Sequence, residues 1–199
     1  MTHWERLCRG TASAAWAYVF LYFDVNLGTI NILPDFACYV LLWQAIACLE
    51  GEERDLRLLR PLCLLLGGWT GLEWAAALLG GSLEGMFLPW DLFLAASGLY
   101  FHFQLFTDFA HLAERYQREG EALDRRLLRL RTVQTLLQTA LTASVALLSP
   151  QAALVFPRDG AAALVLLALA TAGVVVSLML MFGLFALRRC IRQRALEEG

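Results

Sequence analysis

The chain contains no lysine, and charged residues of any kind are scarce along its 199 positions. They make up 17% of the sequence, whereas apolar residues make up 59% and the mean hydropathy is +0.57. A water-soluble domain of this size needs more polar surface to cover its core. The apolar residues also come in runs long enough to cross a bilayer, which takes about 20 residues of helix. The composition excludes an ordinary soluble globule and predicts an integral membrane protein.

Motifs that carry well-known chemistries are absent as well. The five cysteines show no C-x-x-C spacing, which argues against a zinc site or a disulfide framework. The sequence has no H-E-x-x-H, no G-x-S-x-G and no glycine-rich phosphate-binding loop. We therefore expect no cofactor and favour a role other than catalysis. Whether the protein needs a metal stays open.

Six apolar segments follow one another along the chain. We predict membrane spans at residues 11–33, 34–49, 61–79, 87–110, 133–148 and 161–187. The charged residues 111–132, interrupted by Gly120, are predicted to form a cytoplasmic linker that continues the fourth span and leads into the fifth. The predicted fold class is all-α, a single transmembrane domain built as a bundle of six helices.

The arginines set the orientation of this bundle. Fifteen of the 16 basic residues lie before the first span, between the second and third, between the fourth and fifth, or after the sixth. The opposite side holds only Arg158. Because cytoplasmic loops carry the excess of basic residues, both termini are predicted to be cytoplasmic. These arginines follow the topology, so we expect the lipid bilayer as partner, with a homo-oligomer or a membrane partner as further options, and no nucleic acid.

Each even-numbered span opens with an apolar residue, a proline and a nearby aspartate. The three segments are Leu33-Pro34-Asp35, Leu88-Pro89-Trp90-Asp91 and Phe156-Pro157-Arg158-Asp159. Proline suits the first turn of a helix, and aspartate there accepts hydrogen bonds from unpaired N–H groups. The favoured interpretation is three well-capped helices. The alternative is an ancestral helical hairpin repeated three times.

Acidic side chains at membrane depth are the most unusual feature of the sequence. Asp24 and Glu73 lie some turns inside the outer surface, and no arginine lies within a span. An unpaired carboxylate in hydrocarbon must be protonated, hydrogen-bonded, hydrated or neutralised by a cation. The sequence therefore predicts a proton, cation or solute site in the outer half of the bundle. Its candidate residues are Asp24, Asn26, Asn31, Asp35, Glu73, Asp91 and His102.

Other polar and small residues suggest contacts between helices. Gly67, Gly71 and Ala75 form a small-residue seam on the third span, which predicts close packing against another helix. On the fourth span, Asp108 and Arg115 are spaced to pair near the cytoplasmic surface. The fifth span carries polar residues that we expect to face other helices rather than lipid: Gln134, Thr135, Gln138, Thr139 and Thr142.

The segment Tyr22-Phe23-Asp24-Val25-Asn26-Leu27-Gly28-Thr29-Ile30-Asn31-Ile32-Leu33-Pro34-Asp35-Phe36 resembles a recurring stretch of small, uncharacterised membrane proteins of Gram-positive, clostridial-type bacteria. The shared pattern is an acid, Asn and Gly followed by Ile-Leu-Pro-Asp-Phe; Cys38 stands here where that pattern has Gly. The resemblance covers about the first 50 residues. It implies a multi-pass protein of the bacterial cytoplasmic membrane and brings no activity with it.

Residues 25–33 are unusual for a simple turn. They contain Gly28 and follow Asp24 too early for a complete span, so a partly unwound or re-entrant stretch is one interpretation. The other is a helix that continues to Leu33.

Three functions fit the residues. The first is a small transporter or channel-like protein that uses the acidic outer half. The second is a non-catalytic scaffold or accessory subunit, in which the acids cap helices and bond between them. An intramembrane enzyme assembled from scattered residues comes third.

Overall fold

The computed structural model describes residues 2–22, 26–27, 30–31, 36–81, 83, 88–118, 120–148 and 160–198. Within these residues, six long helices carry almost the whole fold, which confirms the all-α prediction. They are α1 (His3–Tyr22), α2 (Phe36–Leu49), α4 (Arg60–Leu78), α5 (Leu88–Tyr116), α6 (Leu123–Leu148) and α7 (Gly160–Glu198). A short helix, α3 (Asp55–Leu58), joins α2 to α4.

Several helices differ in extent from the predicted spans. α1 begins before residue 11 and ends at Tyr22, because the chain then leaves the helix for two short strands. These are β1 (Asn26–Leu27) and β2 (Ile30–Asn31), which pair antiparallel with Asn26 opposite Asn31. The described backbone of this stretch is therefore not helical. α5 and α6 both extend into the predicted linker, so helix occupies most of residues 111–132.

The turn between α5 and α6 is held by local hydrogen bonds. Gly120 has a φ of +92°, a conformation that side chains with a Cβ rarely adopt. The Leu123 N–H donates to Gln117 Oε1 at 2.9 Å, and Gln117 Nε2 donates to Asp124 Oδ1 at 2.9 Å. The Gln117 hydrogen bond lowers the pKa of the exposed Asp124 below its usual value. Gln117 thus caps the start of α6 and closes the turn.

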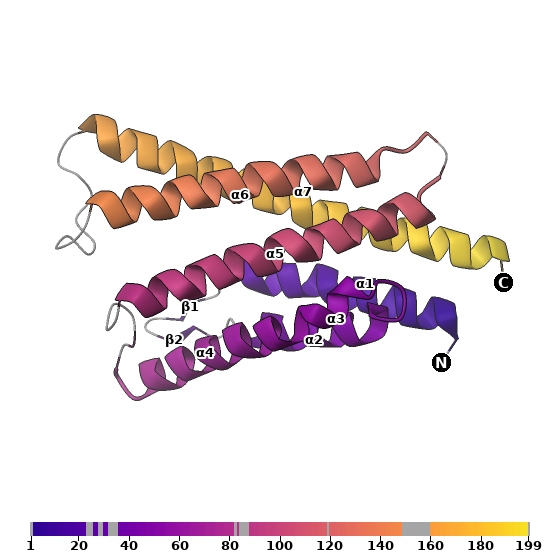
Figure 1. The fold of residues 1–199 in the computed structure, drawn as a ribbon, viewed down its shortest axis with the longest axis horizontal. Coiled ribbons are helices and arrows are strands. Elements are labelled where there is room, and N and C mark those ends of the chain that lie inside the picture. The colour runs from indigo at the N-terminus through magenta and orange to yellow at the C-terminus, as the bar shows by residue number, and fades with distance from the viewer. Residues whose placement is uncertain are drawn as a thin grey trace.

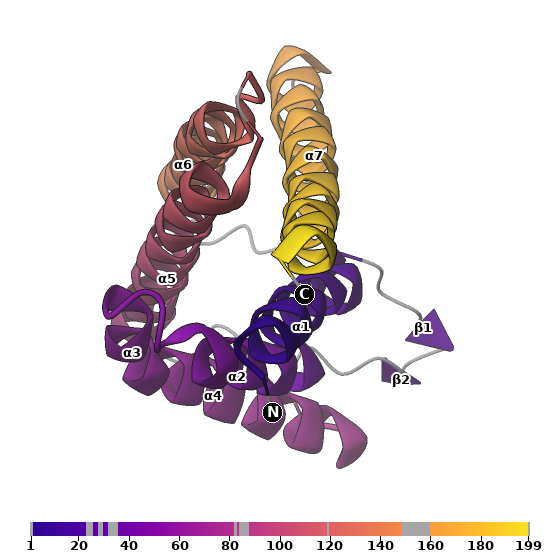
Figure 2. The same cartoon turned by 90° about the vertical axis from the view of Figure 1, so that its right-hand side faces the viewer.

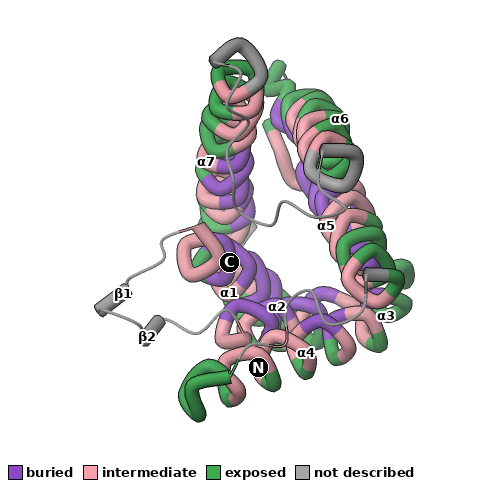
Figure 3. Tube along the Cα trace, turned by 90° about the vertical axis from the view of Figure 1, so that its left-hand side faces the viewer, coloured by how far each residue is buried: buried purple, intermediate pink, exposed green. Residues whose placement is uncertain are grey.

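The six long helices form a ring. Each packs against the next long helix in the chain, and α7 closes the ring against α1. The helices run alternately in opposite directions, as Figure 1 shows. Seen along the bundle in Figure 2, α1, α2 and α4 form one side, while α5, α6 and α7 form the other. The buried residues lie on the helix sides that face one another, and the outward sides are exposed (Figure 3).

One end of the bundle holds both termini, the α2–α3–α4 connection and the α5–α6 connection (Figure 1). We call it the arginine-rich end, because fifteen of the 16 basic residues lie in these segments or in the parts of the helices that adjoin them. Ion pairs link the segments. Arg115 lies 2.6 Å from a Glu53 carboxylate oxygen, His3 lies 3.1 Å from Glu52, and Arg118 pairs with Glu197. The predicted pair between Asp108 and Arg115 is wrong, since the Arg115 side chain reaches across to the α2–α3 connection instead.

Among the described residues, two helices are long and apolar enough to cross a membrane, so the prediction of six spans is not confirmed. They are residues 55–78, which include α3 and α4, and residues 163–197 of α7, with mean hydropathies of 1.2 and 2.6 in their most apolar windows. Only 11% and 17% of those windows are buried. Leu164, Leu167 and Phe182 of α7, for example, are 67%, 57% and 62% exposed. A core helix of a water-soluble protein would hide such residues.

Candidate functional site: a cavity inside the helix ring

A cavity of about 580 Å³ lies inside the ring, and every long helix contributes to its lining. Most of its walls come from α5, α6 and α7. α1 adds Leu21 and Tyr22, α2 adds Tyr39, and α4 adds Leu66. Small-molecule sites in proteins typically measure about 300–1,000 Å³ and combine an apolar lining with a few convergent polar groups. The cavity meets both criteria.

The polar groups of the cavity gather toward the arginine-rich end. α6 runs away from that end, and its polar lining residues Arg131, Gln134 and Thr135 precede the apolar Leu137 and Leu141. α7 runs in the opposite direction, and Leu169, Ala170, Gly173 and Val174 of its lining precede Ser177, while Leu178 and Leu180 follow it. The lining residues with polar side chains are Tyr22, Tyr39, His102, Arg131, Gln134, Thr135, Gln138 and Ser177.

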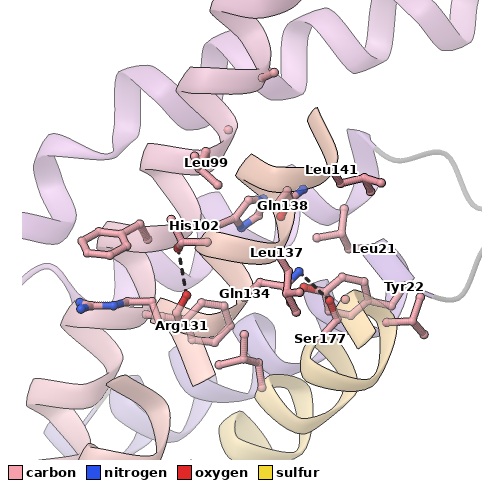
Figure 4. A pocket seen from close by; sticks show the side chains of 18 of the residues that line it. Leu21, Tyr22, Leu99, His102, Arg131, Gln134, Leu137, Gln138, Leu141 and Ser177 are labelled. Carbon is pink, nitrogen blue, oxygen red and sulfur yellow. Dashed lines mark hydrogen bonds between the residues drawn. The ribbon is translucent and has the colours of Figure 1, made fainter. Parts of the chain in front are cut away.

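Hydrogen bonds fix several of these side chains. Gln134 Nε2 donates to Ser177 Oγ at 2.9 Å and so joins α6 to α7 (Figure 4). Thr135 Oγ1 donates to the Arg131 carbonyl oxygen at 2.9 Å, a bond within α6. The Gln134 Oε1 atom is buried and accepts no hydrogen bond. The Gln134 amide nitrogen is thus used to join α6 to α7, while its oxygen is left without a partner.

Arg131 carries the only charged side chain among the described residues of the lining. One of its terminal nitrogens donates to Thr107 Oγ1 at 2.5 Å, and its guanidinium carbon lies 3.8 Å from the centre of the Phe103 ring. Both partners belong to α5. Its Nε atom is buried and donates no hydrogen bond. In the part of the chain that the structure describes, no acidic side chain pairs with it.

A tyrosine–histidine pair bridges the two sides of the ring beside the cavity. The Tyr18 hydroxyl of α1 lies 2.8 Å from His102 Nδ1 of α5, and Tyr18 is completely buried. The Tyr18 ring also packs against Phe106 with ring centres 5.0 Å apart. Since His102 lines the cavity, this hydrogen bond sets the orientation of a cavity imidazole.

Toward the arginine-rich end, the ring next to the cavity is filled mainly by apolar side chains. Leu105, Phe109 and Leu112 of α5 are completely buried there, together with Leu127 of α6 and Leu187 of α7. Asp108 of α5 is buried at the same level and accepts a hydrogen bond from Gln104 at 2.9 Å. This layer separates the cavity from the arginine-rich end.

The structure separates the residues predicted for the acidic site. His102 lines the cavity, while Glu73 and Asp91 do not. Asp91 lies in the first turn of α5, where a carboxylate meets the positive end of the helix. Asp24 and Asp35 lie outside the described residues, and Asn26 and Asn31 are described only as members of the paired strands. Within the described ranges, no three His, Cys, Asp or Glu side chains form a group that could hold a metal ion.

Glu73 takes part in an aromatic contact between α4 and α5. Trp69 Nε1 donates to Glu73 Oε1 at 2.5 Å, one turn apart on α4. The Trp69 ring meets Trp90 of α5 edge to face, with ring centres 5.4 Å apart. Glu73 is thus held by its own helix at the place where α4 meets α5.

The small-residue seam of α4 faces α2 in part. A Cβ at Gly67 would lie 2.8 Å from Tyr39 Cβ, and one at Gly71 would lie 3.8 Å from Phe36. Ala75 is exposed. The close approach of the two helices is therefore concentrated at Gly67.

Several cavity residues were not among the predicted site residues. Of the polar residues predicted to face other helices, Gln134, Thr135 and Gln138 line the cavity, whereas Thr139 and Thr142 are exposed outside it. Arg131 resembled every other arginine of the linker, since its position before an apolar segment is what topology alone requires. Tyr22 and Ser177 carried no signal, because single hydroxyls are common in membrane helices.

Comparison with protein-family models, with curated proteins and with solved structures finds no match for this chain. The resemblance of residues 22–36 to the clostridial-type membrane proteins therefore stays an expectation.

Proposed function

We propose that the chain is a six-span protein of the bacterial cytoplasmic membrane, with both termini cytoplasmic, that acts as a small transporter or channel-like protein. The observation that carries this proposal is the cavity, which all six long helices enclose. A scaffold has no need for a space of this size at the centre of its bundle. Transporters, in contrast, hold their solute between helices near the middle of the membrane.

The ring supports a route across the membrane. The helices run in alternating directions and gather the arginines at one end, which the positive-inside rule assigns to the cytoplasmic side in this proposal. In this proposal the layer around Phe109 separates the cavity from the cytoplasm, and the solute enters from the outer side. Release into the cytoplasm then requires α5, α6 and α7 to separate at that layer. Opening and closing on opposite sides of a central site is the basis of alternating access.

The acidic cation site predicted from the sequence is a separate proposal. The described cavity lining contains no carboxylate, so Glu73 and Asp91 would have to act at the outer ends of α4 and α5. The Trp69 hydrogen bond gives Glu73 a structural role as well. The cavity is the better candidate for the transported solute.

Cysteine accessibility tests the proposal. Thr135 lines the cavity, while its neighbour Leu136 lies outside the lining and is 66% exposed on the outward face of α6. In a variant without the native cysteines, Thr135→Cys should react with a small water-soluble thiol reagent added outside intact cells. It should also react in inside-out vesicles, because the opposite conformation is sampled. Leu136→Cys, facing lipid, should react at least tenfold more slowly from both sides, since thiolates form poorly in hydrocarbon.

Equal rates at the two positions, or no reaction at Thr135→Cys from either side, would favour the scaffold. Reaction from the outside alone would indicate a binding protein without a transport cycle.

A further inference from the structure

The charge of the cavity is opposite to that of the acidic site predicted from the sequence. Arg131 is the one charged side chain of the described lining, and its described neighbours Thr107 and Phe103 are neutral. A guanidinium inside a helix bundle needs compensation, because removing a charge from water is costly without an opposite charge. The described residues supply a hydroxyl and an aromatic ring in place of that charge.

Two buried polar atoms beside this guanidinium lack partners. Arg131 Nε can donate a hydrogen bond, and Gln134 Oε1 can accept one. Buried polar atoms are nearly always paired in folded proteins. Since Arg131 and Gln134 both line the cavity, these two atoms can gain a partner from a ligand toward which the side chains turn. The planar guanidinium suits the two oxygens of a carboxylate or phosphate. A monoprotonated phosphate, which remains an anion, can also donate to the Gln134 oxygen.

The other part of the cavity is apolar. From Arg131 to Leu141 the lining of α6 spans ten residues, or about 15 Å along the helix. Leu94 of α5 and Leu169 of α7 complete the apolar walls at the end away from Arg131. A ligand that fits this lining has a charged head and an extended apolar body.

We infer that the solute of the proposed transporter is an amphipathic anion, a carboxylate or phosphate joined to an apolar chain. Its head lies at Arg131 and its chain extends toward Leu94, Leu141 and Leu169. This assignment rests on the proposed function for the movement of the solute, although the binding itself can be measured without transport. The oxyanion belongs either to a free amphiphile or to a membrane lipid.

Binding of defined probes tests the ligand class. The full-length protein is placed in phosphatidylcholine nanodiscs, and equilibrium binding of radiolabelled dodecanoate is measured below its micelle concentration. Dodecanoate and dodecylphosphate should bind saturably at one site. Dodecanol and dodecyltrimethylammonium, which share the chain but not the negative head, should compete at least tenfold more weakly.

The variants Arg131→Gln and Arg129→Gln form a matched pair. Both remove one positive charge from α6, but Arg129 is exposed and outside the cavity. We expect Arg131→Gln to weaken dodecanoate binding about tenfold to hundredfold, the scale of a lost hydrogen bond to a charged group. Arg129→Gln should bind like the parent. If Arg131→Gln fails to fold, Arg131→Lys keeps the charge and should bind dodecanoate in preference to dodecyltrimethylammonium.

Equal dodecanoate affinity in the parent and Arg131→Gln would overturn the inference, as would tighter binding of the cation. Nanodiscs containing phosphatidic acid distinguish the two sources. Loss of dodecanoate binding in those nanodiscs assigns the site to a membrane lipid, and undiminished binding assigns it to a free amphiphile.

The two proposals fail in different ways. Saturable anion binding together with Thr135→Cys reacting only from outside would retain the ligand class and remove the transport role. Reaction of Thr135→Cys from both sides without anion binding would retain the transport role and remove the ligand class.

Discussion

Individual side chains in this protein hold the ring together across a space that is not filled. Tyr18 reaches from α1 to His102 on α5, and Gln134 reaches from α6 to Ser177 on α7. Arg131 joins α6 to Thr107 on α5. Each bond links helices at the level of the cavity, where apolar packing is incomplete. The polar groups therefore serve stability and define the walls of the site at once.

The Tyr18–His102 bond should contribute measurably to stability. Tyr18→Phe leaves His102 Nδ1 without its partner, so we expect a loss of about 0.5–2 kcal/mol and a lower Tm in detergent. Tyr100→Phe is the control, because Tyr100 lies on α5, the helix that carries His102, and is 58% exposed. It should change the free energy of unfolding by less than about 0.5 kcal/mol. Matching Tm values for the two variants would mean that the bond contributes nothing.

Cys190 at the arginine-rich end should be an unreactive thiol. Burial raises its pKa to about 11, and a hydrogen bond to the Glu121 carboxylate 3.4 Å away acts in the same direction. Alkylation by iodoacetamide requires the thiolate, so the rate should still rise at pH 10, where a thiol of pKa about 8.5 has levelled off. Glu121→Gln removes the charge that disfavours the thiolate, and should raise the rate several-fold at pH 8.

The experiment uses a variant in which Cys190 is the single cysteine. Glu114→Gln, at another exposed acid of the same end, should leave the rate unchanged. A rate that levels off near pH 9 in the parent would contradict the shift.

At the scale of the helices, the distance between neighbouring helices differs from one part of the ring to another. α1, α2 and α4 pack tightly, and glycine makes part of this contact. Gly67 lets α4 meet Tyr39, and a Cβ at Gly10 of α1 would lie 2.6 Å from Leu49 of α2. On α5 and α7, small residues such as Gly98 and Gly173 line the cavity, so little side-chain volume fills the space there. This is consistent with a cavity lined mostly by α5, α6 and α7.

Gly67→Leu should therefore separate α4 from α2. Its Cβ would meet Tyr39 Cβ at 2.8 Å, and this atom cannot move without its backbone. We expect a loss of roughly 1–3 kcal/mol, seen as a lower Tm and a lower yield of folded protein. Gly68→Leu is a matched control, since a Cβ at the neighbouring Gly68 has nothing within 4 Å. If the two variants behave alike, the Gly67 contact does not hold α4 in place.

The whole molecule combines an apolar exterior, a charged end and a central cavity. Outward faces of α4 and α7 expose Leu64, Leu72, Leu164 and Phe182, which suits contact with lipid chains. The ion pairs among His3, Glu52, Arg115 and Glu53 tie the connections together at the arginine-rich end. Exposed ion pairs contribute only about 0–1 kcal/mol each to stability. The apolar packing next to them therefore supplies most of the energy that holds the helices together at this end.

The proposed topology of six spans predicts which positions face each side of the membrane. In a cysteine-free background, Glu121→Cys in the α5–α6 turn should stay unlabelled by an impermeant maleimide added to intact cells, and should react after lysis. Gly81→Cys, exposed beyond the end of α4, should react in intact cells. The positive-inside bias is the reason for both expectations. External labelling of Glu121→Cys would exclude the proposed orientation.

The sequence by itself determined the helices and the end at which the arginines gather. In a membrane, backbone groups must pair within one segment, so apolar runs mark helices. This rule located α2 and α4 to within a few residues and the start of α7, which continues eleven residues beyond the predicted end at 187. It also singled out His102, Gln134 and Thr135 as polar residues on apolar helices. It overextended the first span, because the paired strands at Asn26 and Asn31 depend on backbone pairing that hydropathy does not report.

Only the tertiary structure decided which polar residues share a space. In the sequence, Glu73 and His102 are alike, because each is a titratable residue within an apolar run. In the structure, Glu73 accepts a hydrogen bond from Trp69, whereas His102 lines the cavity. Arg131 differs from the other arginines only because Thr107 and Phe103 of another helix lie beside it. The physical reason is that the ring brings together helices far apart in the chain, and the resulting distances between side chains follow from packing rather than from spacing along the sequence.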